Sequence, residues 1–270
     1  MQCLINGVPA AELSAGDRGL CYGDGLFETM RVANGRIPLL DYHMSRLRRG
    51  LEVLRMPLDL ADTLIELGVL AQDLQTGGIK LTLTRGVGRR GYAIPAEFSA
   101  TRICQSFPPV AYPLEHAQQG VRLFECQTRL AVQPMLAGIK HLNRLEQVLA
   151  RSEWSSPDYA EGLVRDTQGN VIECTMSNLF FLEQDCWVTP ALSGCGVLGV
   201  MRDYLIDQLG RMGQSVTVRP VDMSALLASD EVFCCNSLYG VWPVVALAEA
   251  RWPVGPRTRQ VQALAEQVFM

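Results

Sequence analysis

Long hydrophobic runs are missing from this sequence of 270 residues. No uninterrupted apolar stretch approaches the ~18 residues that a membrane-spanning helix needs. The first residues carry no basic cluster ahead of an apolar stretch, so a secretory signal peptide is not expected. The formal net charge is −4 and the basic residues are scattered, which argues against a nucleic-acid interface. These absences predict a cytoplasmic globular protein that binds neither membranes nor nucleic acids.

Histidine is rare, with three residues, and none of them forms a metal-binding motif with another histidine or with a cysteine. The nine cysteines show no C-x-x-C spacing, which is the usual sign of a zinc or redox site. An odd number of cysteines without a signal peptide indicates reduced thiols, most of them buried as small apolar side chains. We therefore predict no metal site.

Lysine is the scarcest charged residue, because only Lys80 and Lys140 are lysines among 24 basic residues. A primary amine can do covalent imine chemistry that a guanidinium cannot. Lys80 lies in an alternating stretch typical of a strand, whereas Lys140 directly precedes a helix expected over residues 142–154. The positive end of a helix dipole and partial burial both favour the free amine, so Lys140 is the candidate reactive group. From spacing alone, a surface cation near a helix start is the alternative.

The composition, 48% hydrophobic and 19% charged, is that of a chain with a sizeable buried core. Two hairpins are expected, one turning at Asn6-Gly7 and one at Asn34-Gly35 between arms 26–33 and 36–40. Further strands are expected at residues 79–84, 101–107, 121–126, 161–165, 179–182, 216–218, 231–235 and 241–246. Helices are expected at residues 42–55 with Asp41 as N-cap, 59–74, 142–154, 201–212 and 257–268.

Three prolines within residues 107–113 mark the best candidate for a linker. They divide the chain into an N-terminal α+β domain over residues 1–107, a linker over 108–118 and a C-terminal domain over 119–270. The strands are too short and too often joined by hairpins for a doubly wound parallel sheet. The predicted fold class is therefore α+β in two domains.

A glycine-rich segment, Gly86-Val87-Gly88-Arg89-Arg90-Gly91, follows a predicted strand and matches the pattern G-x-G-x-x-G. The residues after it, which end in Pro95, do not open a helix, as a dinucleotide-binding turn requires. We therefore expect an arginine-bearing loop that contacts an anionic substrate, and no dinucleotide site.

Two further segments are candidates for charge recognition. The glycine-punctuated turn Gly196–Gly199 leads into a helix, so backbone N–H groups at Val200 and Met201 would form a phosphate site. Glu173 lies between apolar residues in a strand-like segment, and a buried carboxylate there needs a cationic partner. An ordinary charge on an edge strand is the alternative for Glu173.

Taken in order, the segments resemble the fold-type-IV pyridoxal-phosphate enzymes. This family includes branched-chain aminotransferases, D-amino-acid aminotransferases and 4-amino-4-deoxychorismate lyases. The resemblance runs nearly from end to end and rests on Asp17-Arg18-Gly19, Tyr22–Glu28, His43–Leu47, Gly138–Glu146, Glu173 ahead of Ser177–Phe180, Gly199–Arg202 and Asn236-Ser237. It implies a D-amino-acid-aminotransferase-like fold with a smaller N-terminal α/β domain, a larger C-terminal pseudo-barrel domain and a homodimeric assembly.

The resemblance also implies a role for each matching residue. Lys140 falls at the lysine that carries pyridoxal 5'-phosphate as a Schiff base and is the catalytic residue. Arg46 falls at the arginine that holds the cofactor phosphate, and Glu173 at the carboxylate paired with the pyridinium nitrogen. The remaining cofactor-binding residues are Val200 and Met201 at a helix start and Asn236 and Ser237 in a second phosphate loop.

Within the family, the run Ala137–Leu149 is similar to the lysine motif of the lyases, and Arg85–Tyr92 is similar to their R-G-x-G-x-R-G-Y segment. Arg89 departs from that pattern, so Arg89 and Arg90 remain alternatives for substrate contact. We assign Arg90, Tyr92 and Thr29 to the substrate.

The activity that this resemblance implies is conversion of 4-amino-4-deoxychorismate to 4-aminobenzoate and pyruvate, a step of folate biosynthesis. An aminotransferase acting on branched-chain or D-amino acids is the first alternative. A cofactor-free binding protein that keeps the fold is the second.

Overall fold

The computed structural model describes residues 2–270 and divides into two compact units. Unit 1 contains the chain up to Val110 together with Ile139–Asn143, and unit 2 contains Ala111–Gly138 and Arg144–Met270. Both units combine helices with a sheet, so the α+β prediction is confirmed. The short segment Ile139–Asn143 belongs to unit 1 by its contacts, although its neighbours on both sides in the sequence belong to unit 2.

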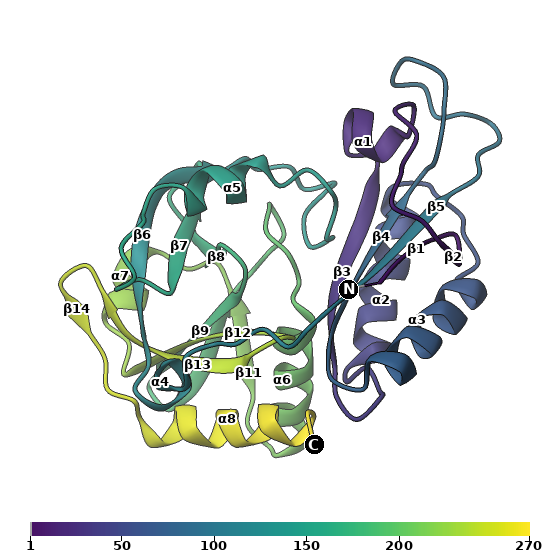
Figure 1. The fold of residues 1–270 in the computed structure, drawn as a ribbon. Coiled ribbons are helices and arrows are strands. Elements are labelled where there is room, and N and C mark those ends of the chain that lie inside the picture. Colours follow the sequence, from purple (N-terminus) through teal and green to yellow (C-terminus); the bar gives the residue numbers. More distant parts are fainter. Residues whose placement is uncertain (1) are drawn as a thin grey trace. The chain divides into compact units, whose positions relative to one another are not determined.

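Unit 1 contains a five-stranded antiparallel sheet in the order β2-β1-β5-β4-β3 (Figure 1). The strands are β1 (Cys3–Ile5), β2 (Val8–Pro9), β3 (Gly25–Val32), β4 (Gly77–Thr84) and β5 (Thr101–Phe107). The helices are α1 (Arg18–Tyr22), α2 (Leu40–Val53) and α3 (Ala61–Leu74). The helix α2 packs on β3, and α3 packs on β4 and β5, which buries the apolar residues between the sheet and these helices.

Alternation along β3 separates two sets of side chains. Leu26, Glu28 and Met30 are buried, whereas Phe27 and Thr29 are half-buried. Successive side chains of a strand point to opposite faces of the sheet. Glu28 therefore lies on the same face as the apolar core, and Phe27 and Thr29 lie on the opposite face.

The segment Ile139–Asn143 pairs with the first residues of β3, Gly25–Phe27. The N–H of Phe27 donates to the carbonyl of Lys140 at 3.0 Å, and the N–H of Leu142 donates to the carbonyl of Gly25 at 3.0 Å. Leu26 and His141 form an antiparallel bridge between these two bonds. This backbone pairing attaches Lys140 to the sheet of unit 1.

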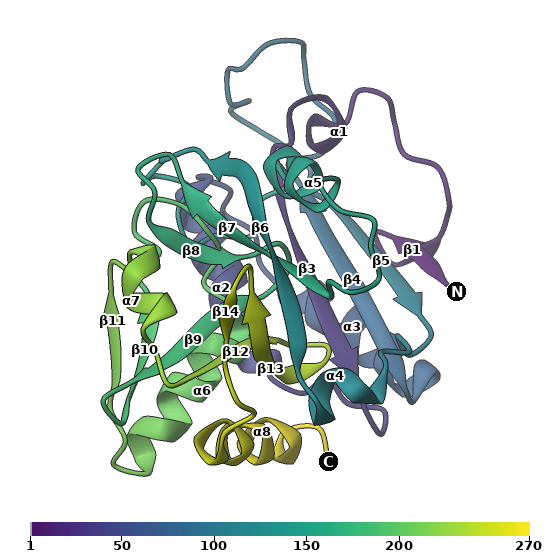
Figure 2. The same cartoon turned by 90° about the vertical axis from the view of Figure 1, so that its left-hand side faces the viewer.

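Unit 2 contains a mixed sheet of nine strands that curls around its own core (Figures 1 and 2). Its main path runs β11-β10-β9-β12-β13-β6-β7-β8, and β14 pairs with β13. The strands are β6 (Val121–Leu130), β7 (Glu161–Asp166), β8 (Val171–Cys174), β9 (Asn178–Glu183), β10 (Cys186–Pro190), β11 (Val216–Arg219), β12 (Glu231–Asn236), β13 (Gly240–Leu247) and β14 (Ala250–Arg251). The curled sheet agrees with the pseudo-barrel expected for the C-terminal domain.

Five helices accompany this sheet. They are α4 (Leu114–Gln118), α5 (Leu145–Arg151), α6 (Val200–Arg211), α7 (Met223–Leu227) and α8 (Pro256–Gln267). The helices α6 and α8 pack against each other and against β12. The core between the strands includes Leu163, Phe181, Val232 and Val244, all completely buried.

Three local predictions are wrong. The helix expected over residues 142–154 is the shorter α5, because residues up to Leu142 are used in the pairing with β3. Asp41 does not cap α2; Leu39 holds that position with a positive φ of 59°, and Asp41 lies in the first turn. The second arm of the hairpin at Asn34-Gly35 reduces to one bridge between Ala33 and Arg36, because the chain enters α2 almost at once.

The cysteines are all free, and six of the nine are buried, as the sequence predicts. In the described part of the chain, no helix is both long enough and apolar enough to cross a membrane.

Candidate active site

A buried cluster in unit 1 links β3 to α2. Glu28 accepts hydrogen bonds from Arg46 Nε at 2.8 Å and from Arg46 Nη2, and it contacts His43 Nδ1 at 2.6 Å. The three side chains meet because His43 and Arg46 are three residues apart on one face of α2, the face that packs on β3. Glu28 thus fixes the orientation of Arg46, the arginine that the family resemblance assigns to a cofactor phosphate.

Burial and neighbouring charges determine which side chains of this cluster are ionised. Burial raises the pKa of the Glu28 carboxyl, but the Arg46 charge and the His43 hydrogen bond outweigh it and lower that pKa from 4.5 to about 2. Burial lowers the pKa of His43, and the nearby charges of Arg46 and Lys140 lower it further against the opposing effect of Glu28. A neutral His43 therefore donates from Nδ1 to an ionised Glu28. Within residues 2–270, His43 Nε2 is buried without a hydrogen-bond partner.

Lys140 lies over an aromatic ring of the same unit. Its Nζ is 4.5 Å from the centroid of the Phe27 ring, and the other lysine of the chain, Lys80, is 5.6 Å from the same centroid. The expectation that Lys140 sits at the N-terminus of a helix is wrong, since α5 begins only at Leu145. Pairing with the edge of β3, rather than a helix dipole, determines the position of this amine.

In unit 2, Glu173 on β8 holds the loop that leads to α6. The buried carboxylate accepts a hydrogen bond from the N–H of Val197 at 2.9 Å. Arg144 lies within electrostatic reach, because the charge of Glu173 raises the pKa of Arg144 against the larger lowering effect of burial. Sequence patterns gave no reason to single out Arg144, since its proximity to Glu173 arises only in the folded unit.

In the loop before α6, the side chain of Asn178 lies directly against the backbone. Asn178 Nδ2 donates to the carbonyl of Val197 at 2.9 Å. A Cβ placed on Gly199 would lie only 1.9 Å from Asn178 Oδ1, so this position admits no side chain without displacing Asn178. Gly199 is the N-cap of α6 and supplies no side-chain hydrogen bond to the helix. The first N–H groups of α6, at Val200 and Met201, belong to a helix start suited to an anion.

A second loop of unit 2 follows β12. Asn236 Oδ1 accepts hydrogen bonds from the N–H groups of Leu238 at 2.9 Å and Tyr239 at 3.1 Å, which closes a turn around Ser237. Asn236 Nδ2 donates to the carbonyl of Met176 at 3.3 Å. The turn that carries Ser237 is therefore attached to the segment that follows Glu173.

Glu161, which the sequence analysis missed, organises that segment. This buried carboxylate accepts hydrogen bonds from the N–H of Met176 at 3.0 Å, from Ser177 Oγ at 2.6 Å and from Thr175 Oγ1. Burial raises the pKa of Glu161, and these hydrogen bonds only partly offset the increase. A glutamate at the start of a strand has no local signature, so the sequence alone could not have revealed this role.

The glycine-rich segment forms a loop of unit 1, and no helix follows it. Gly86 and Gly91 have positive φ angles of 80° and 110°, and a Cβ on Gly86 would collide with the carbonyl of Ser99. Gly86 and Gly91 thus serve the conformation of the loop itself. Arg90 is exposed, and Tyr92 is 87% exposed with its ring 5.5 Å from that of Tyr22.

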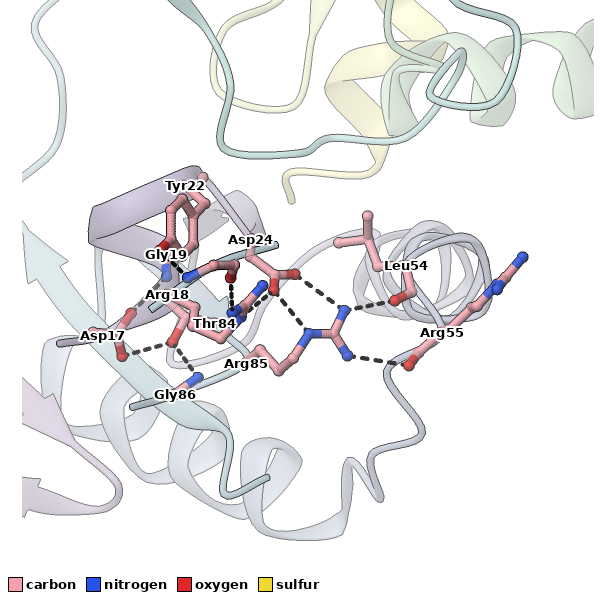
Figure 3. Close-up of polar contacts among 12 residues, drawn as sticks. Asp17, Arg18, Gly19, Tyr22, Asp24, Leu54, Arg55, Thr84, Arg85 and Gly86 are labelled. Atoms are coloured by element: carbon pink, nitrogen blue, oxygen red, sulfur yellow. Dashed lines mark hydrogen bonds and ion pairs between the residues drawn. The ribbon is translucent and has the colours of Figure 1, made fainter. Parts of the chain in front are cut away.

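The loop is anchored by ion pairs between the half-buried Asp24 and two buried arginines, Arg18 and Arg85 (Figure 3). Asp24 accepts two hydrogen bonds from Arg85, at 2.8 and 3.0 Å, and one from Arg18 at 2.8 Å. Arg85 also donates to the carbonyls of Leu54 and Arg55 at the end of α2. Burial raises the pKa of Asp24, but the two arginines outweigh it and hold that pKa below its ordinary value. The carboxylate is therefore ionised at neutral pH.

Comparison with known proteins decides the family. The profile of amino-transferase class IV matches residues 25–247. The chain belongs to the class IV aminotransferase family. It is 37% identical over 264 residues to the aminodeoxychorismate lyase of Vibrio harveyi, covering 96% of this chain and 97% of that protein.

Two further relatives of this class IV family member differ in their named activity. The crystal structure of 4-amino-4-deoxychorismate lyase from Pseudomonas aeruginosa superposes with a TM-score of 0.97 at 51% identity, covering 99% of this chain and all of that one. D-alanine aminotransferase of Bacillus licheniformis is 28% identical over 263 residues, or 94% of this chain and 90% of that protein. The fold and the family predicted from the motifs are confirmed.

The structure distributes the predicted site residues between the two units. Those in unit 1 are Arg46, Lys140, Thr29, Arg90 and Tyr92, and those in unit 2 are Glu173, Val200, Met201, Asn236 and Ser237. Within unit 1, Lys140 is close enough to His43 to affect its pKa, and His43 shares Glu28 with Arg46. Within unit 2, Glu173 holds the loop that enters α6.

Proposed function

We propose that this protein is a pyridoxal-phosphate-dependent lyase that converts 4-amino-4-deoxychorismate to 4-aminobenzoate and pyruvate. One observation carries the proposal, namely similarity along the whole chain to two proteins named aminodeoxychorismate lyase, at 37% and 51% identity. The similarity extends through the lysine motif and the arginine-bearing loop, where the sequence resembles the lyase branch of the family.

The residues present fit pyridoxal 5'-phosphate, a cofactor on which the family depends in general. A phosphate suits the start of α6, where Gly199 leaves backbone N–H groups without a side-chain cap. It also suits the Arg46 guanidinium, whose orientation Glu28 fixes. A protonated ring nitrogen suits the buried carboxylate of Glu173. When bound, the cofactor supplies an electron sink for the bonding electrons released at the substrate carbon.

In the proposed reaction, one lysine moves the protons and the other side chains hold the cofactor. Lys140 would hold the cofactor through its amine and, as a free amine, would remove the proton from the substrate carbon that bears the amino group. The same amine would return a proton to the methylene carbon of the departing enolpyruvyl group. Glu173 would keep the ring nitrogen protonated. The residues that would bind the phosphate are Arg46 of unit 1 and Val200, Met201, Asn236 and Ser237 of unit 2.

Substrate recognition falls to Arg90, Tyr92 and Thr29 in this proposal. The substrate is a dianionic ring compound, so a guanidinium suits a carboxylate and an aromatic ring suits the flat carbon skeleton. Thr29 lies on the same face of β3 as Phe27, over which Lys140 lies. This shared face supports Thr29 as a substrate contact.

The homodimer and the cytoplasmic location expected from the sequence remain parts of this proposal. An apolar face on α5 supports self-association, because Leu145, Val148 and Leu149 are 76%, 60% and 58% exposed. Three neighbouring apolar side chains exposed on one short helix are typical of a surface that another molecule covers.

A turnover assay tests the proposed activity. Cofactor-loaded protein is supplied with 4-amino-4-deoxychorismate and no keto acid, and pyruvate and 4-aminobenzoate are measured together. We expect equal release of both products, since a lyase needs no amino acceptor. No release from protein that binds the cofactor would favour an aminotransferase, which a panel of D- and branched-chain amino donors would then identify.

The aminotransferase alternative draws on the 28% identity with D-alanine aminotransferase. The cofactor-free alternative makes a different prediction about the purified protein. Such a protein would be colourless and would show no absorbance change when pyridoxal phosphate is titrated into it.

A further inference from the structure

The tip of the glycine-rich loop is attached to helix α1 through one residue. The N–H of Gly91 donates to the hydroxyl of Tyr22 at 2.9 Å, and the carbonyl of Gly91 accepts from Arg18 Nη1 at 2.9 Å. Both backbone groups of Gly91 are therefore bonded to side chains of α1. These two bonds lie immediately before Tyr92 and immediately after Arg90 in the chain.

The two side chains that hold Gly91 are themselves fixed. Arg18 is 4% exposed and donates from Nε to Asp24, whose other hydrogen bonds come from Arg85 (Figure 3). The Arg18 guanidinium lies 5.0 Å from the centroid of the Tyr22 ring, which adds a cation–π contact. Because its Nε donates to Asp24 and its Nη1 donates to the carbonyl of Gly91, we assign Arg18 a structural role rather than a contact with the substrate.

Small residues in the loop make this attachment possible. A Cβ on Gly88 would lie 2.8 Å from Arg18 Cδ, so the aliphatic part of Arg18 passes directly against the loop backbone. Gly91 has a φ of 110°, which a residue with a side chain rarely adopts. The Tyr22 ring also packs edge-to-face against Tyr92 at 5.5 Å between centroids. Each of these contacts lies within unit 1.

We propose that Tyr22 and Arg18 are positioning residues for substrate recognition. They fix the backbone at Gly91 and thereby determine where the Arg90 guanidinium and the Tyr92 ring meet an anionic ring-bearing substrate. This inference rests on the proposed function, which assigns Arg90 and Tyr92 to the substrate. Neither Tyr22 nor Arg18 is assigned a contact with the substrate or the cofactor.

The substitution Tyr22→Phe tests the attachment while leaving the aromatic pair in place. Loss of the hydroxyl leaves the Gly91 N–H without its acceptor, and a hydrogen bond of this kind contributes about 0.5–1.5 kcal/mol, or about two- to tenfold in an equilibrium. We expect peptides that cover residues 86–98 to exchange their amide hydrogens about two- to tenfold faster by mass spectrometry. Unchanged exchange would show that Tyr22 does not hold the loop and would overturn the proposal, while leaving the proposed function intact.

Steady-state kinetics test the consequence for the substrate. Arg90 and Tyr92 would bind the substrate equally in the ground state and the transition state, so a displaced loop changes KM and not kcat. We expect Tyr22→Phe to raise KM about two- to tenfold with kcat changed less than about twofold. Arg18→Lys, which cannot reach Asp24 and Gly91 with the same paired geometry, should raise KM at least as much. A fall in kcat at constant KM would contradict the positioning role.

A matched control is Tyr204→Phe in unit 2. Its hydroxyl donates to the carbonyl of Leu264 at 3.2 Å and is likewise bonded to backbone, but it lies far along the chain from the loop. We expect its KM and the exchange of peptides 86–98 to equal those of the wild type. The absorbance of the bound cofactor and the unfolding midpoint are measured in every variant, to separate a local effect from loss of the fold.

A mutant cycle decides whether Tyr22 acts through Arg90 and Tyr92. In a background that carries both Arg90→Ala and Tyr92→Ala, Tyr22→Phe should raise KM no further, because both groups that it positions are gone. Additive effects on KM would mean that Tyr22 acts elsewhere and would overturn the proposal. An unchanged KM in the background enzyme would instead remove Arg90 and Tyr92 from the proposed substrate site, and the positioning role would fall with them even if exchange showed the attachment to be real.

Discussion

Glu28 is the residue on which the buried cluster of unit 1 depends. It is 1% exposed and receives hydrogen bonds from both Arg46 and His43, so its carboxylate is a buried counter-charge in direct contact with Arg46. Breaking a buried ion pair by removing one partner typically costs about 3–5 kcal/mol, because the remaining charge is left uncompensated. Glu28 is therefore expected to affect stability and the placement of Arg46 together.

The pH dependence of stability follows from this pair. The pKa of Glu28 is lowered from 4.5 to about 2, so the folded state holds the proton less tightly than the unfolded chain. Its stabilising contribution is fully present above about pH 5 and is lost as the pH falls toward 2. We expect the urea midpoint of the wild type to decline over this window, and Glu28→Gln to be less stable at pH 7 and to lack this part of the decline. An equally steep decline in Glu28→Gln would contradict the assignment.

Lys140 offers a second test at the same scale. Lys140→Ala should abolish turnover, because it removes the amine that the proposal assigns to holding the cofactor and moving the proton. The natural control is Lys80→Ala, since Lys80 lies over the same Phe27 ring and is the only other lysine of the chain. We expect Lys80→Ala to keep its activity within about tenfold of the wild type. Near-normal turnover by Lys140→Ala would exclude the proposed mechanism.

At the scale of elements, the start of α6 depends on a single glycine. In Gly199→Ala the new Cβ would collide with Asn178 Oδ1, which is expected to displace Asn178 from the carbonyl of Val197. We expect the affinity for pyridoxal phosphate, measured by absorbance titration, to fall at least about tenfold, since the N–H groups of the helix start lose their alignment.

The same helix contains the matched control, Gly210→Ala. A Cβ on Gly210 meets nothing within 4 Å, and alanine favours a helix over glycine by up to about 1 kcal/mol. We expect Gly210→Ala to raise the unfolding midpoint slightly and to leave cofactor affinity unchanged. A loss of affinity in both variants would show that the effect comes from the helix as a whole.

Helices and strands with a clear periodicity of apolar residues were predictable from the sequence. Elements whose ends depend on contacts with residues distant in the sequence were not. The strand over residues 101–107 and the helices α6 and α8 were placed within one or two residues, because periodicity and glycine boundaries act locally. The start of α5 was misplaced because an apolar pattern near Leu142 cannot reveal that its backbone pairs with β3. The motif order identified the family. Glu161 carried no local signal, and Arg144, although it lies within the lysine motif, carried none that pointed to Glu173.

At the scale of the whole molecule, the apolar face of α5 predicts self-association. Leu149→Asp places a charge in that face, and we expect it to shift the protein from dimer to monomer in sedimentation experiments, because burying an unpaired carboxylate is unfavourable. Ile65→Asp is the matched control, since Ile65 on α3 is 65% exposed and lies outside the α5 face. A monomeric wild type, or equal dissociation by both variants, would contradict the assignment of this face.

During synthesis of the chain, the outer edge of β3 remains unpaired for a time. The five strands of unit 1 are complete once Phe107 has left the ribosome, but the segment Ile139–Asn143 that pairs with β3 is synthesised only after the whole of β6. Until then the nascent chain presents a bare strand edge, the kind of surface on which other chains assemble. Slow translation between Val110 and Ile139 would lengthen this exposure, so the rate of synthesis in that interval bears directly on how much protein escapes aggregation.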